Sequence, residues 1–321
     1  MVTSTPGRST ESGCPVSAEA VVTSGIATTL ELSTPIVFGG LGGVLSERSG
    51  VLNIALEGML LIGAFGYFAG AAATGSVFGG LAVAVASATA SALLLAWLAV
   101  HAGADQVIAG MAVNLLASGL TDFLYQAIYG FAGTPPVPGM GAVGIPLLDR
   151  IPVVGASLFE QSLLTYVAFL AVPAVSFWLF RTRAGLHVLA VGERPEAADA
   201  AGLGVFKIRY LAVLASGVAC GLGGAFILTQ VNSFSSDMTA GVGYIALAAV
   251  IFGNWRPRGV LVAALLFGAF EALQSILQSL GLSVPYDLFL AVPYLVTIVA
   301  VSGFVGRVRA PQADGIPYVR N

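Results

Sequence analysis

The chain has 321 residues, of which 57% are hydrophobic and only 9% are charged, with a formal net charge of −3. A water-soluble domain needs about 25% charged residues to cover its surface, so this composition excludes an ordinary soluble fold. The small net charge gives no support to nucleic-acid binding. Continuous apolar runs of about 20 residues cross a bilayer as helices. The sequence therefore predicts an all-α integral membrane protein in contact with lipid.

Residues 1–20 are rich in Ser, Thr and Pro and are predicted to form a mobile polar tail. No apolar segment precedes Cys14, which argues against a cleaved signal peptide or a lipoprotein site. Cys220 lies in an apolar run, so the two cysteines are not expected to pair. About nine hydrophobic spans follow the tail. They are residues 22–45, 52–74, 76–100, 106–130, 162–181, 208–231, 240–255, 259–281 and 286–304.

The basic residues predict an orientation. When nine spans alternate across the membrane, eleven of the 13 Lys and Arg residues fall on one side, and only Arg8 and Arg150 fall on the other. Cytoplasmic loops carry the excess of basic residues. The N-terminus is therefore expected outside and the C-terminus in the cytoplasm. The predicted regions are a permease domain over 21–305, an external loop at 131–161, a cytoplasmic coupling segment at 182–207 and a cytoplasmic tail at 306–321.

Two spans begin abruptly with similar sequences. Residues 50–56 read GVLNIAL and residues 241–247 read GVGYIAL, and a GLGG run precedes each of them at 40–43 and 221–224. The polar run QVNSFSSDM before the second copy indicates at least one interrupted helix. In the nine-span arrangement the copies run in opposite directions. Inverted repeats with interrupted helices are typical of transporters, although Gly- and Ala-rich spans also resemble one another by chance.

Polar side chains recur on single faces of three predicted spans. Residues three, four or seven positions apart share a helix face, and polar groups at membrane depth normally face a pathway or the bundle interior. The candidate pathway residues are Asn53, Asn114, Ser118, Asp122 and Gln274. Glu57, next to the predicted helix break, and Glu271 are candidates for a structural polar role. Hydrogen bonding between helices explains all of these residues equally well, so both interpretations stay open.

The stretch GERPEAADAAGLGVFKIRY, residues 192–210, is unusually polar for this chain. Pro195 suits the first turn of a helix and Glu196 suits its positive end. The alanines that follow favour a helix, and Gly202 would end it. The sequence therefore predicts a short helix with a small-residue face that another protein can approach closely. A solvated loop between two spans is the alternative.

No catalytic or cofactor-binding motif is found. Lys207 is the only lysine and fits no P-loop, so ATP hydrolysis by that route would need a partner protein. Neither a metal-ligand spacing nor a Ser/His/Asp arrangement occurs, which argues against a membrane-embedded enzyme.

The pattern Glu196-Ala197-Ala198-x-x-x-Gly202 resembles the EAA motif of ABC-importer permeases. Three longer stretches resemble the nucleoside and simple-sugar branch of the family that contains ribose and branched-chain amino-acid permeases. They are LSERSGVLNIALEGMLLIGAF (45–65), ADQVIAGMAVNLLASGLT (104–121) and GVGYIALAAVIFGNWRPRG (241–259). The resemblance covers residues 30–305, nearly all of the membrane part.

This resemblance implies the permease subunit of an importer that carries nucleosides across the bacterial inner membrane. It implies a heterodimer with a second homologous permease, an ATPase with two nucleotide-binding halves that binds ATP-Mg, and an extracytoplasmic binding lipoprotein. The ATPase-coupling residues would be Arg194, Glu196, Ala197, Ala198 and Gly202.

Three alternatives to nucleoside import stay open. An importer of simple sugars or of branched-chain amino acids would have the same architecture. In an ion-coupled secondary transporter, Glu57, Asp122 and Glu271 would instead bind ions.

Overall fold

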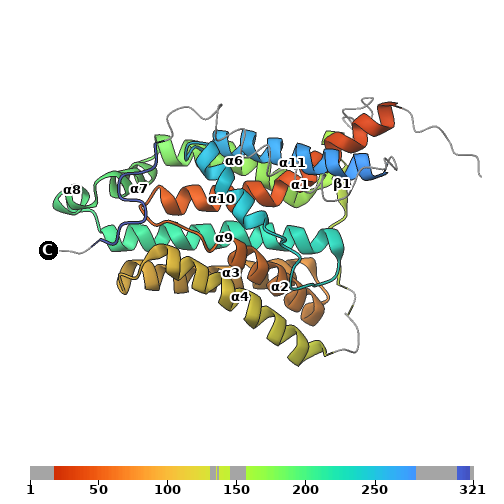
Figure 1. Cartoon of the computed structure of the whole chain (residues 1–321), viewed down its shortest axis with the longest axis horizontal. Coiled ribbons are helices and arrows are strands. Elements are labelled where there is room, and N and C mark those ends of the chain that lie inside the picture. The colour runs from red at the N-terminus through yellow and green to blue at the C-terminus, as the bar shows by residue number, and fades with distance from the viewer. Residues whose placement is uncertain (1–17, 131–134, 136, 145–156, 280–308, 319–321) are drawn as a thin grey trace, which may run out of the picture.

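The computed structural model describes residues 18–130, 135, 137–144, 157–279 and 309–318. This part is almost entirely helical (Figure 1). Its elements are α1 (Ala18–Glu47), α2 (Leu56–Thr74), α3 (Val77–Ala96), the π-helix η1 (Trp97–His101), α4 (Gln106–Tyr129), β1 (Ala142–Gly144), β2 (Glu160–Ser162), α6 (Leu163–Arg181), α7 (Arg183–Glu193), α8 (Pro195–Ala200), α9 (Val205–Val231), α10 (Val242–Phe252) and α11 (Pro257–Ser279). Within these ranges, six helices are long and apolar enough to cross a bilayer, with α3 and η1 counted as one.

Each of the first eight predicted spans overlaps one helix, in chain order α1, α2, α3, α4, α6, α9, α10 and α11. The ninth predicted span, at 286–304, lies outside the described residues, as do most of the N-terminal tail and much of the loop 131–161. Three elements were not predicted. They are α7 and the two strands β1 and β2, which pair antiparallel with Val143 opposite Gln161.

The long helices α1 and α9 pack against each other at the centre of the bundle. α1 also contacts α10 and α11, whereas α9 also contacts α2 and α3. Glycines allow these close approaches: a side chain at Gly224 of α9 would come within 2.1 Å of the Leu60 carbonyl oxygen of α2. A side chain at Gly39 of α1 would come within 2.9 Å of Ala246 of α10. Small residues at such contacts are the usual means of packing helices in a membrane.

Both α2 and α10 begin part way along the bundle (Figure 1). With 11 residues, α10 is about 16 Å long, too short to cross a hydrocarbon core of about 30 Å. The non-helical residues 232–241 precede it, and residues 50–55 precede α2. Gly50 and Gly241 have φ angles of +86° and +87°, a backbone conformation that glycine adopts without strain.

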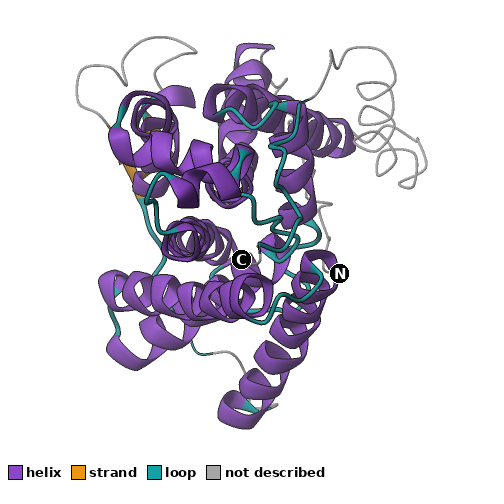
Figure 2. Ribbon diagram, turned by 90° about the vertical axis from the view of Figure 1, so that its left-hand side faces the viewer, coloured by secondary structure: helices purple, strands orange, loops and turns teal. Residues whose placement is uncertain are grey.

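Basic residues gather at one end of the bundle, which we call the α8 end because α8 lies there (Figure 1). All of the basic residues that the structure describes lie at the helix ends and turns of this end. They are Arg48, Arg181, Arg183, Arg194, Lys207, Arg209, Arg256, Arg258 and Arg309. Figure 2 views the bundle from this end, with several helices close to end-on.

Residues 309–318, which we call the C-terminal strap, pack against the α8 end. The Ala313 N–H donates to the Gly192 carbonyl oxygen at 2.9 Å. Arg209, at the start of α9, is fully buried and donates from Nη1 to the Ile316 carbonyl oxygen at 3.1 Å. The Tyr318 ring lies 5.5 Å from that of Phe206, centroid to centroid. The strap therefore joins the end of α7 to the start of α9.

Candidate functional site

A cavity of about 340 Å³ lies where α2 and α10 begin, beside the middle of α4. Its wall combines apolar and polar side chains with backbone from the non-helical segment before α10. The lining residues are Glu57, Gly58, Leu61, Met111, Asn114, Leu115, Ser118, Ser236, Asp237, Thr239, Ala240, Gly241 and Tyr244.

Glu57, in the first turn of α2, holds the start of α10. Its Oε1 accepts a hydrogen bond from the Gly241 N–H at 3.0 Å, and its Oε2 accepts one from the Gly243 N–H at 2.6 Å. The first N–H groups of a helix have no partner within the helix, and the positive end of the helix dipole favours a carboxylate. One side chain therefore satisfies two such groups and fixes the two helix starts together.

Asn114, on α4, holds the start of α2 in a similar way. Its Oδ1 accepts from the Gly58 N–H at 2.8 Å, and its Nδ2 donates to the Ile54 carbonyl oxygen at 2.9 Å. The same Nδ2 lies 3.2 Å from the hydroxyl of Tyr244 on α10. The amide therefore connects the three elements that surround the cavity.

The structure brings some of the predicted polar residues together and separates others. Asn114, Ser118 and Glu57 line the cavity. Asn53 does not, because it is fully buried and its Nδ2 donates to Ser216 Oγ of α9 at 2.8 Å. Asp122 lies one turn beyond Ser118 on α4, where its Oδ2 accepts from Gln126 at 3.0 Å.

Gln274 and Glu271 lie on α11, away from the cavity lining. Both side chains are half-buried. α11 packs against α1, α6 and α10. These contacts place the α11 polar stripe on a different side of the bundle from the α4 stripe, so the two do not meet at this cavity.

The sequence did not predict that residues 236–244 form part of the cavity wall. Tyr244 is half-exposed at the cavity, and Asp237 is exposed beside it. The polar run before α10 was the available signal, because a polar non-helical segment at membrane depth is tolerated only inside protein or along a water-filled cavity. Its composition does not, however, say which helix it faces.

No group of three or more His, Cys, Asp or Glu residues that could hold a metal ion occurs in the part of the chain that the structure describes. Of the acidic side chains that line the cavity, Glu57 accepts hydrogen bonds from the backbone N–H groups at the start of α10.

The short helix α8 lies at the end of the bundle with Pro195 in its first turn. Glu196 and Ala197 are exposed, as is Arg194 just before the helix. Ala198 is buried and packs with Val191 and Val205, so it anchors α8 instead of facing outward.

Beyond α8, the exposed Gly202 has a φ of +85°, and its N–H donates to the Asp199 carbonyl oxygen at 2.8 Å, which closes the turn. The exposed face of α8 therefore consists of small and charged side chains on a short, firmly attached helix.

Asp314 gives the C-terminal strap a pH dependence. Burial raises the pKa of its carboxyl from 3.8 to about 7, although a hydrogen bond from the Gly315 N–H and the charge of Arg209 act against this rise. Because the pKa is higher in the folded chain than in the unfolded chain, this group favours the packed strap most below pH 4, and the contribution is lost as the pH rises through about 7.

We therefore expect the amide hydrogens of residues 309–318 to be less protected at pH 8 than at pH 6. Hydrogen exchange followed by mass spectrometry, corrected for the intrinsic rate at each pH, measures this protection. Asp314→Asn should reduce the difference. Equal protection at both pH values in the unmodified chain would contradict the assignment.

Comparison with known proteins agrees with this architecture. A family model described as the permease component of branched-chain amino acid transport systems matches residues 25–301. Two relatives are the guanosine ABC transporter permease NupQ of Bacillus subtilis, 41% identical over 92% of this chain and 96% of its own length, and the nucleoside ABC transporter permease NupC of Lactococcus lactis, 37% identical over the same shares. A third is the putative glucose ABC transporter permease TsgC13 of Haloferax volcanii, 42% identical over 79% of this chain and 78% of its own. No solved structure matches the chain.

The helical bundle and the family match together define a multi-pass membrane protein that serves as a translocation component and not as a catalyst. The chain belongs to the family of permeases of branched-chain amino acid transport systems. This confirms the resemblance seen in the EAA pattern and in the three longer stretches. It also favours an ATP-driven importer over the ion-coupled alternative.

Proposed function

We propose that this chain is the permease subunit of an ATP-driven importer of nucleosides. The observation that carries the proposal is its 41% identity to a guanosine permease over 96% of that protein's length. A second relative of similar coverage is named as a nucleoside permease. Identity maintained from end to end supports a shared solute class better than a match to the membrane helices alone.

The cavity suits a solute of this class. Its volume of about 340 Å³ lies within the range of small-molecule sites, which runs from about 300 to 1,000 Å³. Leu61, Met111 and Leu115 offer an apolar surface for a planar base, whereas Ser118 and Tyr244 offer hydroxyl groups to a sugar. Weak contacts of both kinds are what a pathway needs, because the solute must also leave.

Filling the cavity tests this proposal. Ser118 is exposed and lines the cavity, so Ser118→Trp should lower uptake of radiolabelled guanosine by about tenfold or more. Uptake is measured in membrane vesicles that contain the complete transporter. Gly119→Trp is the matched control, since a side chain at Gly119 would meet no atom within 4 Å. Unchanged uptake by Ser118→Trp would show that solute does not pass this cavity.

A simple sugar is the second candidate solute, because a putative glucose permease is 42% identical to this chain. The same vesicles decide between the two. Unlabelled adenosine or cytidine in excess should compete with labelled guanosine, and unlabelled glucose should not. Uptake of labelled glucose without uptake of guanosine would show that the solute is the sugar and not the nucleoside.

We further propose that the α8 end is cytoplasmic and that the N-terminus lies outside. The support is the gathering of the basic residues at the α8 end, since cytoplasmic loops carry the excess of Lys and Arg. The permease domain would then extend over 21–305, with the loop 131–161 outside and the segment 182–207 and the tail 306–321 inside.

A second homologous permease is the proposed neighbour of α4. Ser118 and Gln126 are exposed, and Asp122 lies between them on the same face of α4. A charged group exposed to hydrocarbon costs several kcal/mol. A partner subunit that covers this face would remove that cost and complete the wall of the cavity. Of the pathway residues proposed from the sequence, Asn114, Ser118 and Asp122 on α4 would then line the pathway. Asn53 and Gln274 would pack helices together.

Transport is driven, in this proposal, by an ATPase with two nucleotide-binding halves, which binds ATP-Mg and contacts the exposed face of α8. Arg194, Glu196, Ala197 and Gly202 would touch it, whereas Ala198 would anchor the helix from below. An extracytoplasmic lipoprotein would deliver the solute from the other side. Closure of the nucleotide-binding halves would displace α8 and alternate the bundle between its two open states.

We also propose that α1–α3 and α9–α11 are inverted repeats. The support is that α1 packs on α10 and α11, whereas α9 packs on α2 and α3. A two-fold axis that exchanges α1–α3 with α9–α11 would relate these two sets of contacts. The two GLGG runs occupy matching places, since Gly43 approaches Val250 of α10 and Gly224 approaches Leu60 of α2. The interrupted helices α2 and α10 would be equivalent, as in many transporters.

A further inference from the structure

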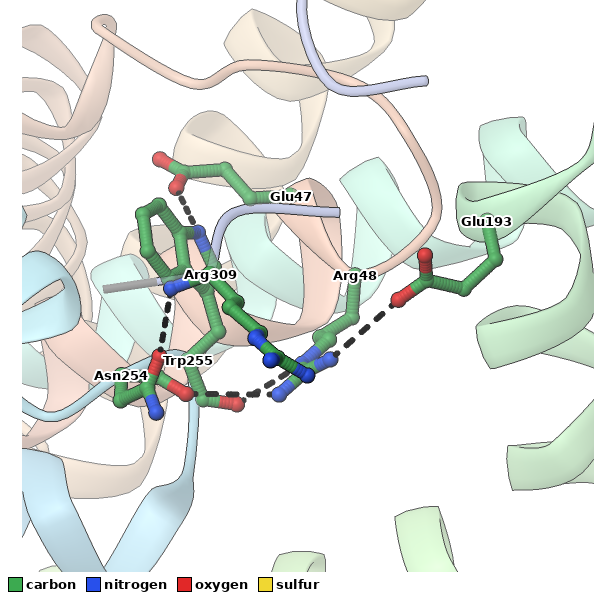
Figure 3. A network of polar contacts seen from close by, with 6 residues as sticks. All are labelled: Glu47, Arg48, Glu193, Asn254, Trp255 and Arg309. Atoms are coloured by element: carbon green, nitrogen blue, oxygen red, sulfur yellow. Dashed lines mark hydrogen bonds and ion pairs between the residues drawn. The ribbon is translucent and has the colours of Figure 1, made fainter. Parts of the chain in front are cut away.

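A polar cluster at the α8 end connects the last residue of α1 with the turn between α10 and α11 (Figure 3). The Trp255 Nε1–H donates to Glu47 Oε2. Arg48 donates from Nε to the Trp255 carbonyl oxygen at 2.9 Å and from Nη2 to the Asn254 carbonyl oxygen at 3.3 Å. Asn254 and Trp255 have φ angles of +53° and +51°, which side-chain-bearing residues adopt at a cost. The bonds from Arg48 help to hold this turn in that conformation.

Arg48 also faces the segment that carries α8. Its Nη1 lies 3.9 Å from Glu193 Oε1, at the last residue of α7 and just before α8 (Figure 3). A side chain at the neighbouring Gly192 would come within 2.1 Å of the Arg48 carbonyl oxygen, so the end of α7 lies directly on the α1–α2 connection. A half-exposed ion pair of this length adds little stability, and its importance lies in what it connects.

α10 links this cluster to the cavity. The helix ends at Phe252, next to the Asn254–Trp255 turn, and begins at Val242, where Glu57 holds it. It is about 16 Å long. Along its length it packs closely on α1, since side chains at Gly39 and Gly43 would each meet it within 2.9 Å. A short, closely packed helix moves as one body, so a displacement at the turn reaches the cavity wall.

We propose that Arg48 is a positioning residue that attaches the α7–α8 segment to the C-terminal end of α10, so that a displacement of α8 is passed along α10 to the cavity. Contiguous packed elements can carry coupling of this kind, and only a measured coupling demonstrates it. The proposal rests on the proposed contact between α8 and an ATPase. It adds the route by which that contact reaches the solute.

Two single-cysteine reporters test the route in the complex assembled with its partner permease, ATPase and binding protein. With Cys14 and Cys220 replaced by alanine, Ala200→Cys reports on α8 and Ser236→Cys reports on the cavity. The measurement is the rate of labelling by a water-soluble maleimide, without nucleotide and with ATP plus vanadate. In the otherwise unmodified chain we expect nucleotide to change both rates by severalfold.

Arg48→Gln should abolish the nucleotide response at position 236 and retain the response at position 200, with basal ATPase activity unchanged. Arg48→Lys, which keeps the charge and a donor, should restore part of the lost response. Arg258→Gln, a change at an exposed arginine of the same end, is the matched control and should behave as the unmodified chain does.

The possible failures are distinguishable. A full response at position 236 in Arg48→Gln overturns the proposed role of Arg48. If position 200 responds in the unmodified chain but position 236 does not, the route through α10 is wrong and the coupling of α8 stands. If position 200 does not respond, both the coupling of α8 and the route through α10 are wrong. If Arg48→Gln does not assemble, Glu193→Gln leaves the Arg48 bonds to the turn intact and should still lower the response at 236 by at least about twofold. An unchanged response would then refute the proposal.

Discussion

Glu57→Ala is expected to reduce guanosine uptake by about a hundredfold. The substitution leaves the N–H groups of Gly241 and Gly243 without their acceptor. Each unsatisfied group costs about 1–3 kcal/mol. The start of α10 would therefore detach from α2, and the cavity wall would lose its shape. Uptake in vesicles and thermal stability in detergent measure the two consequences.

Two further variants distinguish this effect on transport from a general loss of folding. Glu57→Gln keeps one carbonyl acceptor and should give an intermediate result. Glu160→Ala removes an exposed carboxylate from β2, outside the cavity lining, and should change neither uptake nor stability. Normal uptake by Glu57→Ala would show that the junction of α2 and α10 is not needed for transport.

Glu196→Lys is expected to uncouple ATP hydrolysis from uptake. Glu196 is exposed in the first turn of α8, where the interaction of a negative charge with the helix dipole stabilises the helix by about 0.3–1 kcal/mol. The loss in stability is therefore small, but the charge that an ATPase would meet is reversed. Uptake should fall by about tenfold or more while the complex keeps its basal ATPase rate.

The matched control for this change is Glu160→Lys, the same charge reversal at an exposed position on β2. Ala197→Trp adds an independent test because Ala197 is exposed on α8, whereas Ala198→Trp would disrupt the packing with Val191 and Val205 and would not test docking alone. Coupled transport at the normal rate in both Glu196→Lys and Ala197→Trp would refute the proposed role of α8.

Local sequence signals predicted most of the helices and the form of α8. Apolar length alone located eight helices, six of which are long and apolar enough to cross a bilayer. Pro195 and Gly202 marked the two ends of a helix that the structure shows at Pro195–Ala200. The break before α10 was visible as well, because the polar run before Gly241 interrupts an otherwise apolar region. These features depend on residues close together in the chain, so a single sequence contains the information.

The faces of the helices were predicted less well, because rotation about a helix axis depends on distant partners. Asn53 belongs to the same polar stripe as Glu57 by spacing, yet it is bonded to Ser216, which is far away in the chain. Nor could spacing place Gln274 on a separate side from Asn114. The cluster around Arg48 joins residues more than 200 positions apart, so no local pattern indicated it.

The junction of α2 and α10 also has an electrical consequence. Two helix starts meet there, each equivalent to about half a positive charge, and the carboxylate between them supplies about the opposite amount. Among the residues that the structure describes, the remaining wall contributes Asp237 and no lysine, arginine or histidine. A phosphate ester entering this space would find no counter-charge and an acid beside it. A solute pathway through this cavity, as proposed above, would therefore admit neutral molecules and exclude the nucleotides that a cell must not lose.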